Sequence, residues 1–144
     1  MAAAQVYFAT AANFHATFTT GVANTDGSGS LPAPTWWNAG AAPATDWMLV
    51  KLVISSDSAT GVGDLADCLI HIYARDPGAG NAVRLLRTID PGNPAAGTTV
   101  LPGYQLEVNF GPEFVFQANV DLRFAVSVTP TAGNLTILGF AQKL

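Results

Sequence analysis

The stretch from Trp47 to Ser55 alternates between two sets of side chains, as expected of a β-strand in which successive residues point to opposite faces. One face is wholly apolar and consists of Met48, Val50, Leu52 and Ile54. The other face carries a single charge and consists of Trp47, Leu49, Lys51 and Val53. Because so little charge lies on either face, we predict a central strand whose second face also meets protein, from this chain or from another subunit.

The same alternation recurs along most of the chain, between turns rich in Gly and Pro. We predict further strands at residues 5–9, 13–20, 67–75, 82–89, 104–110, 114–116, 120–129 and 134–141. Asn81 as a helix N-cap makes a short helix at 82–88 the competing interpretation of one of them. About eight evenly spaced strands without a convincing helix are typical of an all-β protein, an antiparallel β-sandwich or jelly roll.

The inward positions of four strands predict the core. They are Leu52, Ile70, Leu106 and Phe124. Each is a large apolar residue on the more hydrophobic side of its strand, and that side of a half-buried strand faces the interior. We therefore expect these four side chains to lie in one cluster between two sheets.

Residues 21–43 interrupt the strand pattern. Gly, Ser, Pro and Ala dominate there, and no period is sustained. Irregular segments of this length in a compact domain are usually functional or interacting. We therefore divide the chain into an N-terminal arm and long loop, residues 1–45, and a β-sandwich core, residues 46–144, within a single domain.

Trp36 and Trp37 stand side by side in that irregular segment. One ring could close the end of the sandwich, the pair could anchor a contact with another protein, since Trp is enriched in interface hot spots, or it could stack on a sugar. For contacts with other subunits or with a larger particle, we predict five aromatic anchors. They are Tyr7, Phe8, Trp36, Trp37 and Trp47.

Composition indicates that much of the surface is covered. Charged residues make up 11% of the chain, against about 25% in a typical globular protein, and the mean hydropathy is +0.30. No run of about 18 apolar residues occurs, so a transmembrane helix does not explain this value. We expect a closed homo-oligomer, with a trimer as the expected form.

The charge balance argues against nucleic acid as a partner. The net charge is −4, and the six Lys and Arg residues are scattered from Lys51 to Lys143, whereas phosphate binding needs a concentrated basic face. Cys68 is the single cysteine, so no internal disulfide forms. The N-terminal residues MAAAQVYF lack the features of a secretory signal, which predicts a mature chain assembled in the host cytoplasm without a membrane partner.

Residues 24–30 imitate the start of an EF-hand calcium loop. Asn24, Asp26 and Ser28 supply oxygens at alternate positions, and Gly29 stands sixth. The twelfth position is Thr35, however, where the calcium loop requires a bidentate Glu. We interpret this segment as a surface turn.

Asp64, Asp67, Cys68 and His71 form the one grouping that suggests a transition metal. In a strand, Asp67 and His71 share a face while Cys68 points to the other, which is a poor geometry for a joint site. No nucleophile motif such as GxSxG accompanies His15 or His71, so a hydrolase triad is not indicated. We expect no metal, no cofactor and no enzymatic activity.

From Trp47 to the C-terminus, strands and turns follow a distinctive order. The segments are IHIYAR with its Pro/Gly turn, LLRTIDPGNPAAGTTV, the Pro102-Gly103 step, FGPEFVF, and LRFAVSVTPTAGN before a final strand. This order resembles that of small jelly-roll virion proteins of tailed bacteriophages. The resemblance lies in pattern and turn placement, and it implies a capsid decoration, head-spike or tail accessory component with no catalytic residues to carry over.

The resemblance and the composition together predict a structural virion protein. We expect a capsid decoration (cement) protein that acts by contacts with itself and with the major capsid protein or another virion protein. The alternative is a β-sandwich module that binds carbohydrate or a host surface. Aromatic rings buried between chains would support assembly, and a flat row of solvent-facing rings would support glycan binding.

Overall fold

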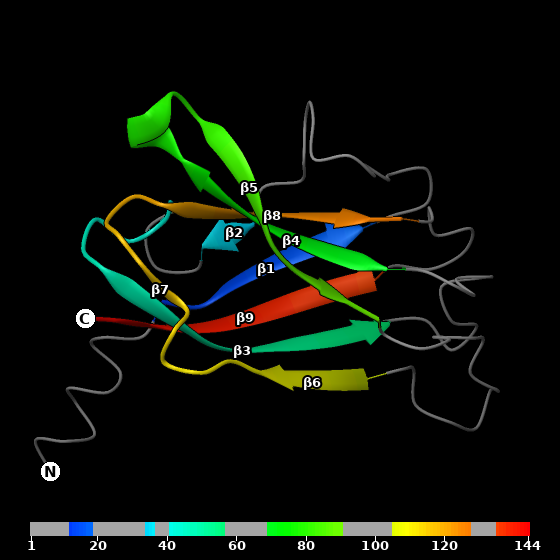
Figure 1. The fold of residues 1–144 in the computed structure, drawn as a ribbon. Helices are drawn as coiled ribbons and strands as arrows, with labels where there is room; N and C mark the ends of the chain where they lie inside the picture. The colour runs from blue at the N-terminus through cyan, green and yellow to red at the C-terminus, as the bar shows by residue number, and fades with distance from the viewer. Residues whose placement is uncertain (1–11, 19–33, 37–40, 57–68, 91–104, 128–134) are drawn as a thin grey trace, which may run out of the picture.

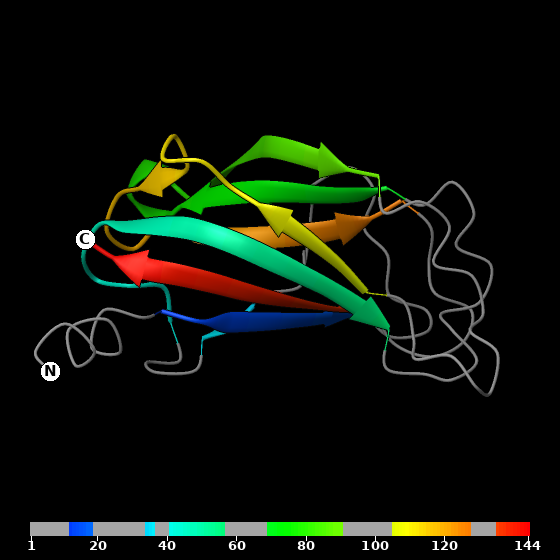
Figure 2. The same cartoon turned by 90° about the horizontal axis from the view of Figure 1, so that it is seen from below.

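The chain folds as two antiparallel β-sheets that face each other (Figures 1 and 2). The structure, a computed structural model, describes residues 12–18, 34–36, 41–56, 69–90, 105–127 and 135–144. Its strands are β1 (Phe14–Phe18), β2 (Thr35–Trp36), β3 (Trp47–Ser56), β4 (Ile70–Asp76), β5 (Ala82–Ile89), β6 (Gln105–Asn109), β7 (Val115–Phe116), β8 (Asp121–Val126) and β9 (Leu135–Lys143). The predicted all-β sandwich is confirmed, and its assignment as a jelly roll remains a prediction.

The larger sheet has the strand order β2-β1-β9-β3-β6, with β7 paired to one end of β3. The smaller sheet has the order β5-β4-β8. A short 3-10 turn, η1 (Pro77–Ala79), joins β4 to β5, and the tip of this hairpin projects from the body of the sandwich in Figure 1. Asp76 stabilises the turn, since its side chain accepts a hydrogen bond of 2.8 Å from the Gly78 amide.

Most strand predictions within the described residues are confirmed. Residues 82–89 form a strand, so the helical interpretation of that segment is wrong. The strand predicted at 5–9 lies outside the described residues. Sequence reasoning missed β2, because two residues are too short to show a period.

The boundary placed between residues 45 and 46 does not separate an arm from the sandwich. β1 pairs with β9 over its full length, from Phe14 opposite Gly139 to Phe18 opposite Leu135, and β2 pairs with β1. Phe14 is completely buried in the core. Its ring lies where a Cβ on Gly139 would stand, so the absence of a side chain at 139 makes room for it. The two strands within residues 1–45, β1 and β2, therefore belong to the larger sheet, which corrects the sequence interpretation.

The faces predicted for the central strand are only half right. β3 is central, with β9 on one side and β6 and β7 on the other. Its register against β9 shifts between Leu49 and Lys51, so Val50 is the extra residue of a β-bulge. Beyond the bulge, Leu52 and Ile54 face the core as predicted; before it, Trp47 and Leu49 face inward. Val50, predicted to be internal, is 39% exposed.

The core lies between the two sheets. Leu52, Ile70 and Phe124 are completely buried in one cluster, and Leu106 is partly buried and packs against it. Trp47 is the largest fully buried side chain in the described part of the chain. Ring contacts continue through the cluster, with the centroids of Trp36 and Trp47 5.3 Å apart. Offset and edge-to-face arrangements at such distances are the favourable ones for aromatic pairs.

Candidate interaction surface

Strand β5 carries the most exposed apolar surface of the described strands. Leu85 is 56% exposed, Val83 37% and Leu86 36%. The strand pairs with β4 along one edge, and within the described residues no strand pairs with its other edge. An exposed apolar edge strand offers both unpaired backbone groups and side chains to another chain. We call Val83, Arg84, Leu85, Leu86 and Arg87 the β5 edge surface.

A bulge sets the direction of the side chains on this surface. Ile72 of β4 lies opposite Arg87, and Ala74 lies opposite Arg84, so three steps along β5 match two steps along β4. The extra residue is Leu86, between Leu85 opposite Tyr73 and Arg87. Because directly opposite residues share a face, the bulge brings Arg84 and Arg87 to one face of the sheet. In a regular strand, residues three apart point to opposite faces.

The two arginines lie on the face that is directed toward the larger sheet, since Ile72 and Ala74 both contact the core. The Arg87 guanidinium lies 5.3 Å from the centre of the Phe110 ring, a cation-π contact between the two sheets. Within the described residues, neither Arg84 nor Arg87 forms an ion pair. In the described part of the chain, this edge therefore carries two guanidinium groups without an acidic side chain at ion-pair distance.

Positive charge is concentrated on the smaller sheet. Its three strands hold four of the six basic residues, Arg75, Arg84, Arg87 and Arg123, and two of the ten acidic residues, Asp76 and Asp121. Asp121 is already paired with Arg123, at 2.6 Å. The three strands therefore carry four positive and two negative charges, a net +2, on a chain whose net charge is −4.

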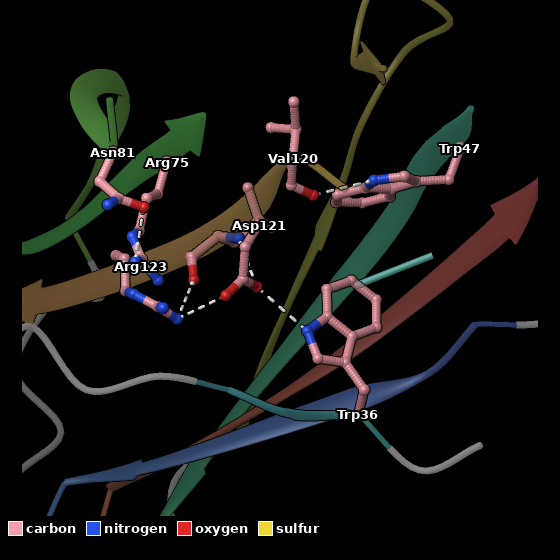
Figure 3. Close-up of polar contacts among 8 residues, drawn as sticks. Trp36, Trp47, Arg75, Asn81, Val120, Asp121 and Arg123 are labelled. Atoms are coloured by element: carbon pink, nitrogen blue, oxygen red, sulfur yellow. Dashed lines mark hydrogen bonds and ion pairs between the residues drawn. The ribbon is translucent and has the colours of Figure 1, made fainter. Parts of the chain in front are cut away.

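The buried tryptophans do not form the surface expected of them. Trp36 is 4% exposed and donates its indole N–H to Asp121 Oδ1 at 3.0 Å, while the completely buried Trp47 donates to the Val120 carbonyl at 3.1 Å (Figure 3). Both rings are covered by residues of this same chain, which corrects their prediction as contact anchors. The other three predicted anchors, Tyr7, Phe8 and Trp37, lie outside the described residues.

Asp121 joins the two sheets at the edge formed by β2 and β8. One carboxylate oxygen accepts from Trp36 and from the Leu122 amide, and the other accepts from Arg123, whose side chain is only 11% exposed (Figure 3). A hollow of about 300 Å³ beside this network is lined in part by Arg75, which donates to Asn81 Oδ1 at 2.7 Å. Because these polar groups satisfy one another, the network is built to hold strands together.

Of the candidate metal and catalytic residues, the structure describes His15 and His71. Among the residues that the structure describes, no three His, Cys, Asp or Glu side chains are grouped as a metal site would require. His71 lies on β4, where Nδ1 is 2.9 Å from Thr88 Oγ1, and His15 lies on β1 opposite Thr35. Asp64, Asp67, Cys68 and the loop at 24–30 lie outside the described residues.

Comparison with known proteins finds no family, and a solved structure to which the chain is similar is a distant one. No protein-family model and no curated protein matches the chain. Among solved structures, it is similar to a chain of the cyanophage Pam1 capsid asymmetric unit, with 12% sequence identity and a TM-score of 0.38, over 93% of this chain and 83% of that chain. A relation this distant assigns neither a family nor a function. No described helix is long and apolar enough to cross a membrane.

The β5 edge surface was not predicted from the sequence. The segment AVRLLRTI is interrupted by the adjacent pair Leu85-Leu86, which breaks the period of two. Such a pair, with basic residues on both sides, is the one sequence signal that could have indicated a bulge with exposed apolar side chains. It indicates neither the free edge nor the direction of the arginines, because both depend on β4.

Proposed function

We propose that this chain is a structural virion protein of the capsid-decoration kind, which acts through protein–protein contacts. Its partners are further copies of itself, a trimer being the expected form, and a major capsid protein or another virion protein. The observation that carries the proposal is the β5 edge surface, where three aliphatic side chains are more than one third exposed on an edge to which no described strand pairs. An exposed apolar edge strand is suited to contact with another protein chain.

The composition supports the same proposal. With 11% charged residues, the chain has fewer solubilising groups than a free monomer of this size usually carries. The β-strand and turn order that resembles tailed-phage virion proteins, including the FGPEFVF segment before β8, is compatible with such a role. In this proposal, the β5 edge surface takes the contact role that the sequence analysis gave to the five aromatic anchors.

The alternative, a carbohydrate-binding module, lacks the feature that would favour it. Glycan-binding sandwiches of that kind were expected to present a flat row of solvent-facing rings. Among the aromatic side chains whose burial is described, none is exposed, and Phe14, Trp36, Trp47 and Phe124 are buried. We therefore prefer protein–protein contact to carbohydrate binding as the proposed function.

Co-sedimentation with empty capsids of the phage that encodes the chain tests the proposal. The wild-type chain should sediment with capsids and reach saturation, and its solution mass should be three times the 14.9 kDa of one chain. Leu85→Asp should weaken capsid binding by at least about tenfold, because a charge would replace an apolar contact. Val50→Asp is the matched control, since Val50 is 39% exposed on the other sheet, and it should bind as the wild type does. A wild-type chain that never sediments with capsids contradicts the proposal.

A further inference from the structure

We infer that β5 accepts an extended acidic segment of a partner protein as an added strand of the smaller sheet. The inference rests on the proposed function and names the chemistry of the partner that the β5 edge surface takes. It follows from three properties of β5: a free backbone edge, two aligned arginines, and aliphatic side chains on the opposite face.

The free edge is long enough to pair with another strand. Residues 83–88 are all exposed, and β5 is bonded to β4 on one side only within the described part of the chain. Strand addition to such an edge forms main-chain hydrogen bonds that provide affinity, and alternate side chains provide specificity. A binding mode that uses backbone groups therefore suits this site better than one that needs a deep pocket.

The bulge at Leu86 defines what the added strand must carry. Arg84 and Arg87 lie on one face and correspond to β4 residues that are two apart, Ala74 and Ile72. A regular strand on the other side of β5 would also meet them with residues two apart, so acidic side chains at alternate positions would oppose both arginines. The intervening residues would point to the opposite face, where Val83 and Leu85 are exposed, and would therefore be apolar.

Charge also selects against a second β5 as the occupant. Two copies of β5 paired antiparallel about their centre would place Arg84 of one copy opposite Arg87 of the other, and like charges directly opposite each other are destabilising. An acidic segment meets the same two groups with opposite charge. The contact with the Phe110 ring also restrains the Arg87 side chain before binding, so binding costs less side-chain entropy.

The test uses the full-length chain and two labelled peptides. One peptide alternates Glu and Val, and its twin has Lys at every Glu position, so the two differ in charge and share length and alternation. Fluorescence anisotropy should show binding of the Glu peptide, weakening with added salt, and at least about tenfold weaker binding of the Lys peptide. Amide hydrogen exchange should show new protection on β5 in the presence of the Glu peptide.

Variants of the two arginines locate the effect. The double variant Arg84→Glu/Arg87→Glu should bind the Glu peptide with a dissociation constant at least about tenfold higher than that of the wild type. Arg84→Lys/Arg87→Lys should retain most of the affinity. Lys143→Glu is the control: it reverses one positive charge on β9, in the other sheet, and should leave binding of the Glu peptide unchanged. A thermal melt of each variant checks that the chain is folded.

Each other outcome overturns the inference. Equal binding of both peptides, no binding of either, or protection that appears away from β5 contradicts an acidic strand at this edge. Protection of β5 that rises with protein concentration alone, together with a doubled mass, shows that a second copy is the occupant. If wild type and the Arg→Glu double variant sediment equally with capsids, the proposed function stands and this inference fails; if the wild type does not sediment with capsids, the function fails whatever the peptides do.

Discussion

Strands β3 and β5 both contain a one-residue bulge, and the bulge has opposite consequences in the two places. In β3 the extra residue is Val50, and the shift brings Trp47 and Leu49 to the same inner face as Leu52 and Ile54. In β5 the extra residue is Leu86, and the shift aligns two arginines and leaves the neighbouring aliphatic side chains exposed.

The difference lies in what flanks each strand. β3 has partners on both sides, so its backbone groups are paired and its apolar residues fill the core. Its one charge is also compensated, since Lys51 lies 3.4 Å from Glu107 and 5.1 Å from the centre of the Phe140 ring. β5 has one partner strand within the described residues, and its arginines have no acidic partner there. A bulge of the same kind therefore completes the core in one sheet and leaves aliphatic and basic side chains exposed at an edge of the other.

Deleting the extra residue of each bulge should give the largest difference in stability between changes in β3 and changes in β5. Deletion of Val50 forces Trp47 and Leu49 off the inner face, and we expect a loss in the free energy of unfolding of at least about 4 kcal/mol, comparable with deleting a buried Trp side chain. Deletion of Leu86 changes an exposed edge and should cost less than about 1 kcal/mol. Urea denaturation midpoints measure both, and equal losses would contradict the comparison.

Truncation of one leucine on each strand gives the next largest contrast. Leu52 is completely buried, so Leu52→Ala should lower the free energy of unfolding by about 2–5 kcal/mol. Leu85 is 56% exposed, so Leu85→Ala should change it by less than about 0.5 kcal/mol. The same denaturation experiment checks both variants, and a loss at Leu52 as small as that at Leu85 would mean that the inner face of β3 is assigned wrongly.

The contact between Gly139 of β9 and the ring of Phe14 on β1 can be tested by mutation. Gly139 lies opposite Leu52 on β3 and opposite Phe14 on β1, and a Cβ at 139 would overlap the buried Phe14 ring. Gly139→Ala should therefore destabilise the chain by about 1–3 kcal/mol through overpacking. The double variant Gly139→Ala/Phe14→Leu should lose less than the sum of the two single variants, because the smaller side chain relieves the overlap. Strict additivity in thermal or denaturant melts would argue against this contact.

An effect smaller than that of Gly139→Ala is expected at the edge opposite β5, where Trp36 of β2 donates a hydrogen bond to Asp121 of β8. Trp36→Phe keeps a ring in the core and removes the indole donor, so the free energy of unfolding should fall by about 1 kcal/mol. Asp121 keeps its bonds to Arg123 and to the Leu122 amide, which limits the loss. Combining Trp36→Phe with Asp121→Asn tests the pair, since a coupling energy near zero in the double-mutant cycle would show that the two side chains do not support each other.

The positions of the strands could be predicted from the sequence because each strand carries its own signal. Three segments, 47–55, 104–110 and 120–129, alternate with a period of two and end near turn residues. They contain or overlap strands β3, β6 and β8, respectively. Three of the four predicted core residues, Leu52, Ile70 and Phe124, are completely buried. Ile70 and Phe124 lie on β4 and β8, which pair with each other in regular register. Leu52 follows the bulge of β3, so the bulge does not change its predicted face.

The candidate surface could not be predicted to the same extent. The aromatic residues were expected at contacts, and Trp36 and Trp47 are instead enclosed by β8 and its neighbours, each with its indole N–H satisfied. A large apolar ring with one polar atom suits a core and an interface equally well, so residue type alone does not distinguish them. The distinction came from partners about 70 to 85 residues away in the chain, since the two bonds span 73 and 85 residues.

The sequence by itself determined that this protein is built of short strands joined by Gly and Pro turns, with little charge on its surface. The alternation of side chains and the turn residues act locally, and they are present before any strand has found a partner. Only the tertiary structure decided which way Trp47, Arg84 and Arg87 point. A bulge is a difference in count between two paired strands, so the faces that it sets are fixed only when β3 pairs with β9 and β5 pairs with β4.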